Sequence, residues 1–259
     1  EAVYMTGDGS AAARLGMPDI GLMTMSEMVD NLARIADASE LPVVADADTG
    51  YGGPINVRRT VREYERAGVA AMHLEDQVHP KRCGHLEGKR IVPAGEMVSK
   101  IKAAVDARRD PGLMIIARTD ANAVEGLDAA LERAQLYRQA GADMLFVESP
   151  TSREQIARIG KSFDCPLLFN AALSGRTPVL SLKEIADYGY KLTIYGCHTV
   201  FVAMAAIRQL LAHLRDTGRI DDLPVPMAPF RDYLQVLGLP EVQELEARYD
   251  LPEQARVRF

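Results

Sequence analysis

The amino-acid sequence predicts an α/β fold, a (β/α)₈ barrel of the TIM type with extra C-terminal helices. Short apolar runs rich in Val, Ile and Leu alternate with segments of helical period along most of the chain. The runs are continuously apolar, which is typical of parallel strands covered by helices. Polar side chains follow their carboxyl ends, where barrels of this type carry their active sites. Strands and helices alternate along the chain without a change in composition, and this pattern favours a barrel over a doubly wound sheet.

Seven apolar runs are predicted to be strands. They are Ala2–Gly7, Pro42–Asp48, Ala70–Asp76, Leu113–Asp120, Met144–Ser149, Pro166–Ala171 and Leu192–Gly196. An eight-stranded barrel needs one strand more, and the chain opens directly into a strand. We therefore expect the first strand and its helix to lie upstream of residue 1.

Amphipathic stripes predict the helices. In each stripe, apolar residues three and four apart fall on one face of a helix. Gly68, Gly141 and Gly189 each follow a helical segment and precede a strand, as expected of the left-handed residue that ends a helix. The stripes begin at Met25, Val57, Met97, Leu127 and Val200.

A helical extension is predicted after the barrel. We place the barrel at residues 1–219 and the extension at residues 220–259, which opens with a linker containing Pro and Asp. Two short helices are expected beyond the linker, at Phe230–Leu237 and Glu241–Tyr249. We expect the extension to pack on a neighbouring subunit or on the outside of the barrel.

Composition and charge exclude several classes of protein. The chain has 259 residues, 47% hydrophobic and 25% charged, as expected of one large globular domain. Its net charge of −6 argues against nucleic acid as a partner, and no apolar stretch is long enough to cross a membrane. The cysteine spacing indicates neither a disulfide framework nor structural zinc. We expect a cytoplasmic protein.

Charged and amide side chains close five of the predicted strands. Residues two apart in a strand share a face, and buried carboxylates without partners are costly. A divalent cation is one partner for them, and all-oxygen ligands favour Mg²⁺ or Mn²⁺ over Zn²⁺. Pairing with Arg118 or with helix termini is the structural alternative, and Arg118 is also the candidate to bind a substrate carboxylate or phosphate. The strand-end residues are Asp46, Asp48, His73, Glu75, Arg118, Asp120, Glu148 and Asn170.

A long connection, residues 76–94, carries a thiol among cationic side chains, in the run Lys81-Arg82-Cys83-Gly84-His85. Cationic neighbours lower the pKa of a thiol and make it reactive. We predict that this loop is a lid and that Cys83 works over the strand ends, with a solvated charged loop as the alternative. Cys165 and Cys197 lie in or beside apolar strands and are expected to be core residues.

The segment Thr6-Gly7-Asp8-Gly9 follows the first predicted strand. Its small residues allow backbone N–H groups to approach an anionic group. A tight turn that requires glycine is an equally good interpretation.

Several separated motifs together resemble the isocitrate lyase / phosphoenolpyruvate mutase superfamily. The resemblance runs from Tyr4 to about Leu214 and implies a barrel, Mg²⁺ as cofactor (with Mn²⁺ as a substitute), a small carboxylate substrate, and a homodimer or homotetramer that exchanges its last helix. The motifs are Leu15-Gly16-Met17-Pro18-Asp19, Asp46-Ala47-Asp48-Thr49-Gly50-Tyr51-Gly52, Glu75-Asp76-Gln77-Val78, the Lys81–His85 run, and Ala117-Arg118-Thr119-Asp120.

The resemblance implies roles for individual residues. Asp46 resembles the direct metal ligand, with Asp19, Asp48 and Glu75 acting near it. Cys83 resembles the proton donor of the lyases, and Tyr4 and Arg118 match further catalytic positions. Substrate-binding positions match Thr6, Gly7, Asp8, Asp46, Gly84, His85, Arg118, Glu148 and Asn170.

The implied activity is Mg²⁺-dependent cleavage of a carbon–carbon bond in a 2-hydroxy or 2-oxo di- or tricarboxylate, through an enolate. The loop around Cys83 resembles a branch with dimethylmalate lyase, oxaloacetate hydrolase and carboxyphosphonoenolpyruvate phosphonomutase. Asp8 and Ala171-Ala172-Leu173 depart from the pattern of 2-methylisocitrate lyase. Phosphoryl rearrangement of the phosphonomutase type, oxaloacetate hydrolysis or decarboxylation, and ligand binding without catalysis stay as alternatives.

Overall fold

Parallel strands form the centre of the fold in the computed structural model, which describes residues 1–173 and 176–258. The order in the larger sheet is β1-β2-β3-β4-β5, and β6 pairs with β7. A parallel bridge between Leu145 and Leu167 connects the two sheets. The strands are β1 Val3–Met5, β2 Val43–Asp46, β3 Ala71–Glu75, β4 Met114–Thr119, β5 Met144–Val147, β6 Leu168–Asn170 and β7 Leu192–Ile194.

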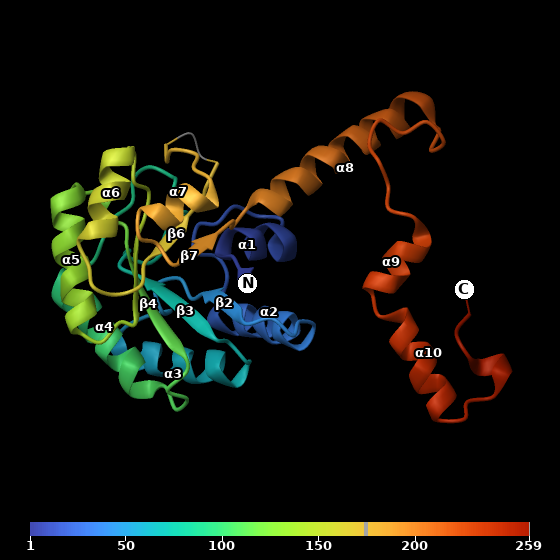
Figure 1. Ribbon diagram of the computed structural model, residues 1–259, viewed down its shortest axis with the longest axis horizontal. Helices are drawn as coiled ribbons and strands as arrows, with labels where there is room; N and C mark the ends of the chain where they lie inside the picture. Colours follow the sequence, from blue (N-terminus) through green and yellow to red (C-terminus); the bar gives the residue numbers. More distant parts are fainter. Residues whose placement is uncertain (174–175, 259) are drawn as a thin grey trace. The chain divides into compact units, whose positions relative to one another are not determined.

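Helices follow the strands and lie outside them, so the expected TIM-type architecture is confirmed (Figure 1). All seven predicted strands are present, each shorter than predicted by two or three residues in total. Gly68, Gly141 and Gly189 end helices with positive φ, as predicted. The helices of this part are α1 Gly7–Leu15, α2 Met25–Asp37, α3 Pro54–Arg66, α4 Ala94–Ala107, α5 Leu127–Gln139, α6 Arg153–Lys161 and α7 Leu182–Asp187, with a 3₁₀ turn at Ala121–Ala123.

The first helix is not among the predicted ones, because the first predicted strand runs on to Gly7. The strand instead ends at Met5, and Thr6 caps α1 by accepting a hydrogen bond from the Gly9 N–H at 3.3 Å. Asp8 lies in the first turn, where its negative charge suits the helix dipole. Gly7 and Gly9 in that turn have low helix propensity, so the sequence does not indicate this helix. Its first residue is set by the Thr6 cap.

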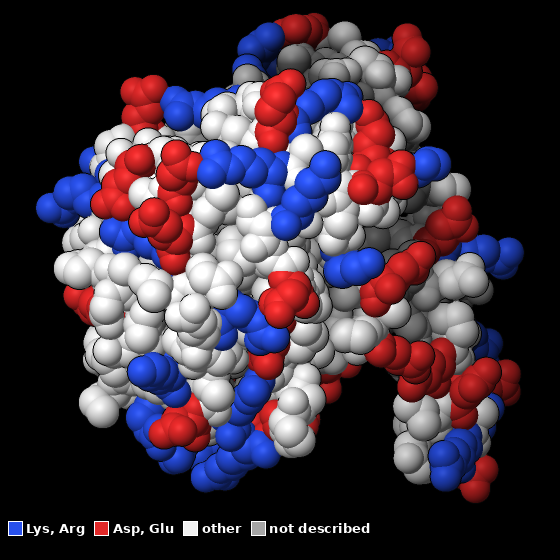
Figure 2. Space-filling view, turned by 60° about the vertical axis from the view of Figure 1, so that its left-hand side comes forward, with Lys and Arg blue, Asp and Glu red and all other residues white. Residues whose placement is uncertain are grey.

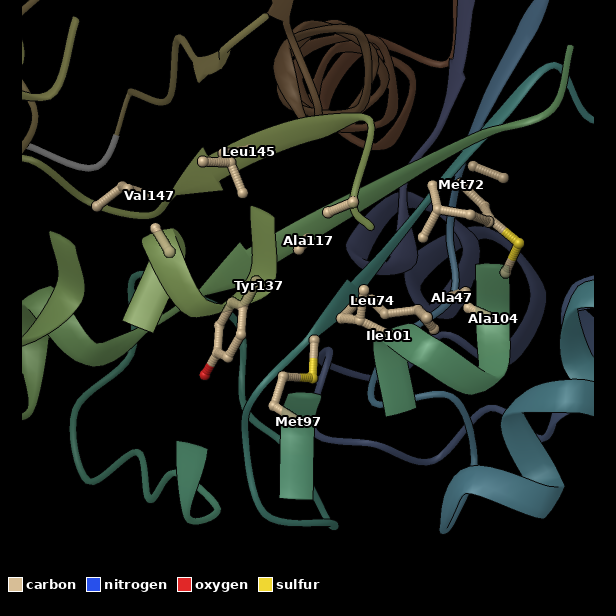
Figure 3. Packing of buried hydrophobic residues seen from close by; sticks show 14 of the residues in the cluster. Ala47, Met72, Leu74, Met97, Ile101, Ala104, Ala117, Tyr137, Leu145 and Val147 are labelled. Carbon is tan, nitrogen blue, oxygen red and sulfur yellow. The ribbon is translucent and has the colours of Figure 1, made fainter. Parts of the chain in front are cut away.

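The outer face of the sheet packs against the helices. Met72 and Leu74 of β3 contact the cluster that holds Met97, Ile101 and Ala104 of α4, as Figure 3 shows. These side chains are fully or almost fully buried. This layer fixes the sheet against its helices.

The inner face changes from apolar to polar along the strands. The inner side chains on the amino-terminal side of the polar residues form a second hydrophobic cluster, which includes Val44, Ala71, Ile116 and Phe146. Because alternate residues of a strand share a face, the next inner residues toward the carboxyl ends are polar. They are Asp46 after Val44, His73 and Glu75 after Ala71, Arg118 after Ile116, Glu148 after Phe146, and Asn170 after Leu168.

Strands β1 and β7 stand at the open side of the barrel. In the described part of the chain they do not pair with each other. A cavity of about 650 Å³ is lined by residues of both strands and of α7. The strand and helix expected upstream of residue 1 stay a prediction.

The chain divides into two compact units, Glu1–Val200 and Phe201–Phe259. The division lies within α8 (His198–Thr217), before the boundary predicted at residue 219. The second unit also contains α9 Phe230–Val236, α10 Leu239–Arg248 and a 3₁₀ turn at Glu253–Ala255, close to the two helices predicted there.

The apolar stripe that the sequence predicts from Val200 onward is not buried. Helix α8, which is described over its whole length, has no buried residue. Met204, Ile207 and Leu211 are each more than half exposed. This apolar face has no covering partner among the described residues.

Surface charge is mixed, and Lys/Arg and Asp/Glu are interspersed over the face shown in Figure 2. None of the helices in the described ranges combines the length and apolar character needed to cross a bilayer. The cytoplasmic location stays a prediction.

Candidate active site

Strand register brings the inner polar residues side by side. Asp46 of β2 pairs with His73 of β3, and Glu75 of β3 pairs with Arg118 of β4. Arg118 in turn stands beside Phe146 of β5, with its guanidinium 5.2 Å from the ring centre. The predicted strand-end residues are therefore gathered at one end of the barrel.

Asp46 lies at the centre of this group. Its carboxylate accepts hydrogen bonds from the N–H groups of Asp48 (2.9 Å) and Gly7 (3.2 Å). A Cβ at Gly7 would lie 2.6 Å from Oδ2 of Asp46, so glycine is needed for this approach. Burial disfavours the charge, but interactions with His73, Lys81 and Arg118 outweigh it and lower the pKa of Asp46 to about 2. The anion that the Gly7 N–H binds here is the Asp46 carboxylate.

Tyr4 and His73 form a buried pair beside Asp46. The Tyr4 hydroxyl lies 2.9 Å from Nε2 of His73, and Nδ1 of His73 lies 3.7 Å from Oδ1 of Asp46. Burial raises the pKa of Tyr4 and lowers that of His73.

Lys81 belongs to the acidic group rather than to the thiol. Its ammonium lies 2.6 Å from Oδ1 of Asp19 and 2.7 Å from Oδ1 of Asp48. Burial raises the pKa of Asp48 to about 7 and also raises that of Asp19, although Lys81 opposes both shifts. Asp48 adopts a left-handed φ of 47° at the end of β2, a backbone conformation that is common at functional sites.

Arg118 is surrounded by carboxylates. It donates to both oxygens of Asp120 at 2.9 and 3.2 Å, and its nitrogens lie 3.3 Å from Glu75 and 3.6 Å from Glu148. Burial raises the pKa of Glu75 well above its usual range, although Arg118 and Lys81 oppose the shift. The predicted pairing with Arg118 is thus present, and a substrate carboxylate would compete with these acids for it.

The acids predicted to bind a metal offer suitable donors. Both carboxyl oxygens of Glu75 and Oδ1 of Asp48 are buried and accept no hydrogen bond of standard geometry, although Arg118 lies 3.3 Å from Oε2 of Glu75 and Lys81 lies 2.7 Å from Oδ1 of Asp48. Such oxygens suit a hard cation like Mg²⁺. The side chains of Asp46, Asp48, Glu75 and Asp19 nevertheless do not converge tightly: among the described residues, the three potential ligands found within 4.8 Å of one another are Asp8, Asp19 and Cys83. The carboxylate oxygens are therefore suitable ligands for a metal ion. In this structure Lys81 and Arg118 balance the negative charge of Asp48 and Glu75.

Cys83 is not activated by its cationic neighbours, contrary to the expectation from sequence. Lys81 binds Asp19 and Asp48, and Arg82 donates to the carbonyl of Glu87 at 2.8 Å. Burial raises the pKa of the Cys83 thiol to about 11. The thiol therefore keeps its proton at neutral pH, which suits a proton donor and not a nucleophile.

The loop after β3 is anchored tightly over the strand ends. A Cβ at Gly84 would lie 2.6 Å from a nitrogen of Arg118, so the loop backbone rests on the charged group. The Gly84 carbonyl accepts from Lys89 and, at 3.1 Å, from Ser149 Oγ. Lys89 also donates to Asp120 at 2.8 Å.

The side chain of Gln77 braces the same loop. It bonds the carbonyl of Arg82 at 2.8 Å and its N–H at 3.0 Å. Sequence reasoning missed Gln77, Lys89 and Ser149 as site-forming residues. For Lys89, the sequence offered one indication, a lysine in the loop that follows the acids at the end of β3.

The remaining predicted substrate-binding residues surround Glu148. Asn170 donates to Glu148 at 3.3 Å, and Nε2 of His85 lies 3.6 Å from the same carboxylate. Nε2 of His85 has no hydrogen-bond partner among the described residues. These groups stand ready to bind a ligand from the loop side and the strand side.

Contrary to the expectation from sequence, Cys197 is not buried in the core. It is half-buried after β7, and its Sγ–H donates to Oδ2 of Asp8 at 3.1 Å. Cys165, by contrast, is buried in the core as predicted. The strand that carries Cys197 ends at Ile194, so its thiol faces the barrel mouth from the following turn.

Comparison with known proteins shows close relatives. The family model described as phosphoenolpyruvate phosphomutase matches residues 1–215. A 2,3-dimethylmalate lyase from Eubacterium barkeri is 47% identical over 249 residues, which cover 96% of this chain and 86% of that protein. A 2-methylisocitrate lyase from Shewanella oneidensis is 42% identical and covers 92% of this chain and 82% of that protein.

Solved structures agree with these relatives. A 2,3-dimethylmalate lyase, in a trigonal crystal form, has a TM-score of 0.92 at 40% identity over 100% of this chain and 87% of that one. Oxaloacetate acetylhydrolase with 3,3-difluorooxalacetate has a TM-score of 0.91 at 39% identity over 97% and 86%. Phosphonopyruvate hydrolase with oxalate and Mg²⁺ has a TM-score of 0.85 at 30% identity over 96% and 86%.

Proposed function

The chain belongs to the phosphoenolpyruvate phosphomutase family and is a carbon–carbon bond lyase, and we propose that it cleaves a 2-hydroxy or 2-oxo acid with two or three carboxylates through an enolate. The observation that carries the proposal is the placement of a protonated thiol, Cys83, over a buried group of acids and cations at the barrel mouth. The two named lyases support a hydroxy acid substrate.

We propose Mg²⁺ as the cofactor, held by Asp46 and Asp48 with Glu75 and Asp19 near it. The buried carboxyl oxygens of Glu75 and Asp48, whose charges are balanced by Arg118 and Lys81, support this assignment, as does the Mg²⁺ in the phosphonopyruvate hydrolase complex. The ion would supply positive charge that stabilises the developing enolate.

Arg118 binds the substrate carboxylate in this proposal. Its guanidinium already lies among three carboxylates, so the substrate takes the place of part of that set. Asn170, His85 and the Thr6–Asp8 segment surround the remaining groups of the substrate. The planar fork of Arg118 orients the acid so that the bond to be cleaved faces the loop.

The proton balance uses Tyr4 and Cys83. Tyr4 takes the hydroxyl proton and gives its own proton to Nε2 of His73, as the hydroxyl carbon becomes a carbonyl and its carbon–carbon bond breaks. The electron pair of that bond moves into the released fragment, which is an enolate. The Cys83 thiol protonates its carbon, and the thiolate recovers a proton afterwards.

The direct test is the variant Cys83→Ser with 2,3-dimethylmalate and Mg²⁺, followed by proton NMR. General acid catalysis typically contributes about 10²- to 10⁴-fold, so we expect kcat to fall by that factor while substrate affinity is kept. Cys165→Ala, in the core, is the matched control and should retain activity. Unchanged turnover by Cys83→Ser would exclude the donor role.

Two other reactions of the superfamily stay as candidates. The similarity to oxaloacetate acetylhydrolase favours hydrolysis of a 2-oxo diacid. The similarity to a phosphoenolpyruvate phosphomutase from Streptomyces platensis, at 32% identity, favours phosphoryl rearrangement. Oxalate among the products would identify the first, and a new phosphorus NMR signal from a carboxyphosphonate would identify the second.

We also propose that the chain forms a homodimer or homotetramer through α8 and the residues after it. The exposed apolar face of α8 supports this partner. Ile207→Glu should shift full-length protein toward monomer in light scattering after gel filtration. Gln209→Glu adds the same charge on the opposite face of α8 and should leave the mass unchanged, and equal masses for both variants would contradict the proposal.

A further inference from the structure

Asp8 introduces a negative charge next to the proton donor. One carboxyl oxygen of Asp8, one of Asp19 and the sulfur of Cys83 lie within 4.8 Å of one another. Asp8 is only partly buried and lies in the first turn of α1. It also accepts a hydrogen bond from the Cys197 thiol at 3.1 Å.

Asp8 forms no ion pair in the part of the chain that the structure describes. Within that part, no Lys, Arg or His nitrogen lies within 4.0 Å of Asp8. Lys81 is held by Asp19 and Asp48, two carboxylates for one ammonium. Two acids and a second thiol therefore lie near the Cys83 sulfur, and the charge of Arg118 also acts on it.

The position of Cys83 identifies which part of the substrate meets Asp8. The carbon that Cys83 protonates belongs to the released fragment, so the substituents of that fragment approach Asp8 and Cys197. Arg118, which binds the retained 2-oxo acid in the proposed function, lies instead among Glu75, Asp120 and Glu148. Asp8 thus adds a negative charge on the side of the released fragment.

We infer that Asp8 is a specificity-determining residue that selects dicarboxylate substrates by repelling an additional carboxylate on the released fragment. The inference rests on the proposed function and deepens it, since it names the substrate class. 2,3-Dimethylmalate, a dicarboxylate, meets the condition. 2-Methylisocitrate, a tricarboxylate, places a second carboxylate on the released fragment and does not. A neutral or hydrogen-bond-donating substituent is accepted, because Asp8 can only accept hydrogen bonds when ionised.

The experiment compares these two acids on wild-type protein, Asp8→Asn and Asp37→Asn, all with Mg²⁺. Asp8→Asn keeps the size of the side chain and removes its charge, and Asp37→Asn removes a charge from the exposed end of α2. A like charge at about 5 Å in a partly buried site corresponds to about a 10- to 100-fold effect. We expect wild type and Asp37→Asn to prefer the dicarboxylate, and Asp8→Asn to raise the tricarboxylate-to-dicarboxylate ratio of kcat/KM by that factor. The ratio is independent of the fraction of folded enzyme.

Titration calorimetry of both acids separates this inference from the proposed function. One possible result is that wild type binds the dicarboxylate more tightly, that Asp8→Asn abolishes this difference in affinity, and that neither acid is cleaved. In that case the proposed lyase reaction on these acids is wrong and the inference about Asp8 stands. If the dicarboxylate is cleaved but both ratios are the same in wild type and Asp8→Asn, the lyase reaction stands and the inference is overturned. A wild-type preference for the tricarboxylate overturns it as well.

Discussion

The strand ends of the barrel and the loop between β3 and α4 both contribute to the active site, but different forces hold them. Arg118, Glu75 and Asp46 lie on strands whose register and inner face are fixed by the sheet and its core. Cys83 and Gly84 lie on a connection whose position depends on a few side-chain hydrogen bonds. Substitution of a strand-end residue should therefore lower both activity and global stability. Substitution of a loop residue should lower activity with little effect on global stability.

The largest effect is expected from breaking the strand-end charge balance with Arg118→Met. Three buried carboxylates would lose their shared cation, and removing one partner of a buried ion pair costs about 3–5 kcal/mol. We expect urea unfolding to show a loss of that size, together with loss of activity.

Arg34→Met is the matched control for that variant. Arg34 pairs with Asp30 on the exposed surface of α2, where an ion pair contributes about 0–1 kcal/mol. Similar losses in both variants would mean that the strand ends are not an electrostatic unit.

A smaller effect on stability but a large one on activity is expected from Lys89→Met in the loop. The variant removes the bonds to the Gly84 carbonyl and to Asp120, while Arg118 continues to hold Asp120. We expect kcat/KM to fall by about 10²-fold, because misplacement of a catalytic group by about 1 Å has that cost. The free energy of unfolding in urea should fall by about 1–3 kcal/mol, the cost of a buried group left unsatisfied.

Lys102→Met, on the exposed face of α4, is the control for the loss of a lysine charge. If Lys89→Met destabilised the protein as much as Arg118→Met, the loop would be part of the barrel core and the distinction between the two regions would fail.

The same distinction explains what could be predicted from sequence. Inner-face residues follow from the period of two along each strand, so the amino-acid sequence alone places Asp46, Glu75 and Arg118 together. The partners of the loop do not follow from it, because Lys81 meets Asp19 across 62 residues and Lys89 meets Asp120 across 31. Because Lys81 is close to Cys83 in sequence, we predicted that its charge would act on the thiol. The burial that raises the pKa of this thiol cannot be recognised from the neighbouring residues in the sequence.

Gln77→Ala is expected to loosen the loop without affecting the barrel. It removes both hydrogen bonds to the backbone of Arg82, each contributing about 0.5–1.5 kcal/mol. Trypsin cleaves after Lys and Arg, so cutting after Lys81 or Arg82 should accelerate by about tenfold when local opening limits the rate. Gln135→Ala, on the exposed surface of α5, is the control. Cutting at an unchanged rate would show that other contacts hold the loop.

The smallest and most local effect concerns the proton on Cys83. Because burial raises its pKa to about 11, the thiolate fraction stays low at neutral pH and rises with pH until about pH 11. The rate of iodoacetamide labelling at Cys83, followed by mass spectrometry of the peptide in metal-free protein, should therefore still be rising above pH 9. An ordinary exposed thiol would level off after its pKa of about 8.5. If labelling of Cys83 levelled off near pH 8, its cationic neighbours would control the thiol after all, and the loop would behave as its sequence alone suggested. A continued rise would show that the loop holds the thiol in its protonated form, as a donor requires.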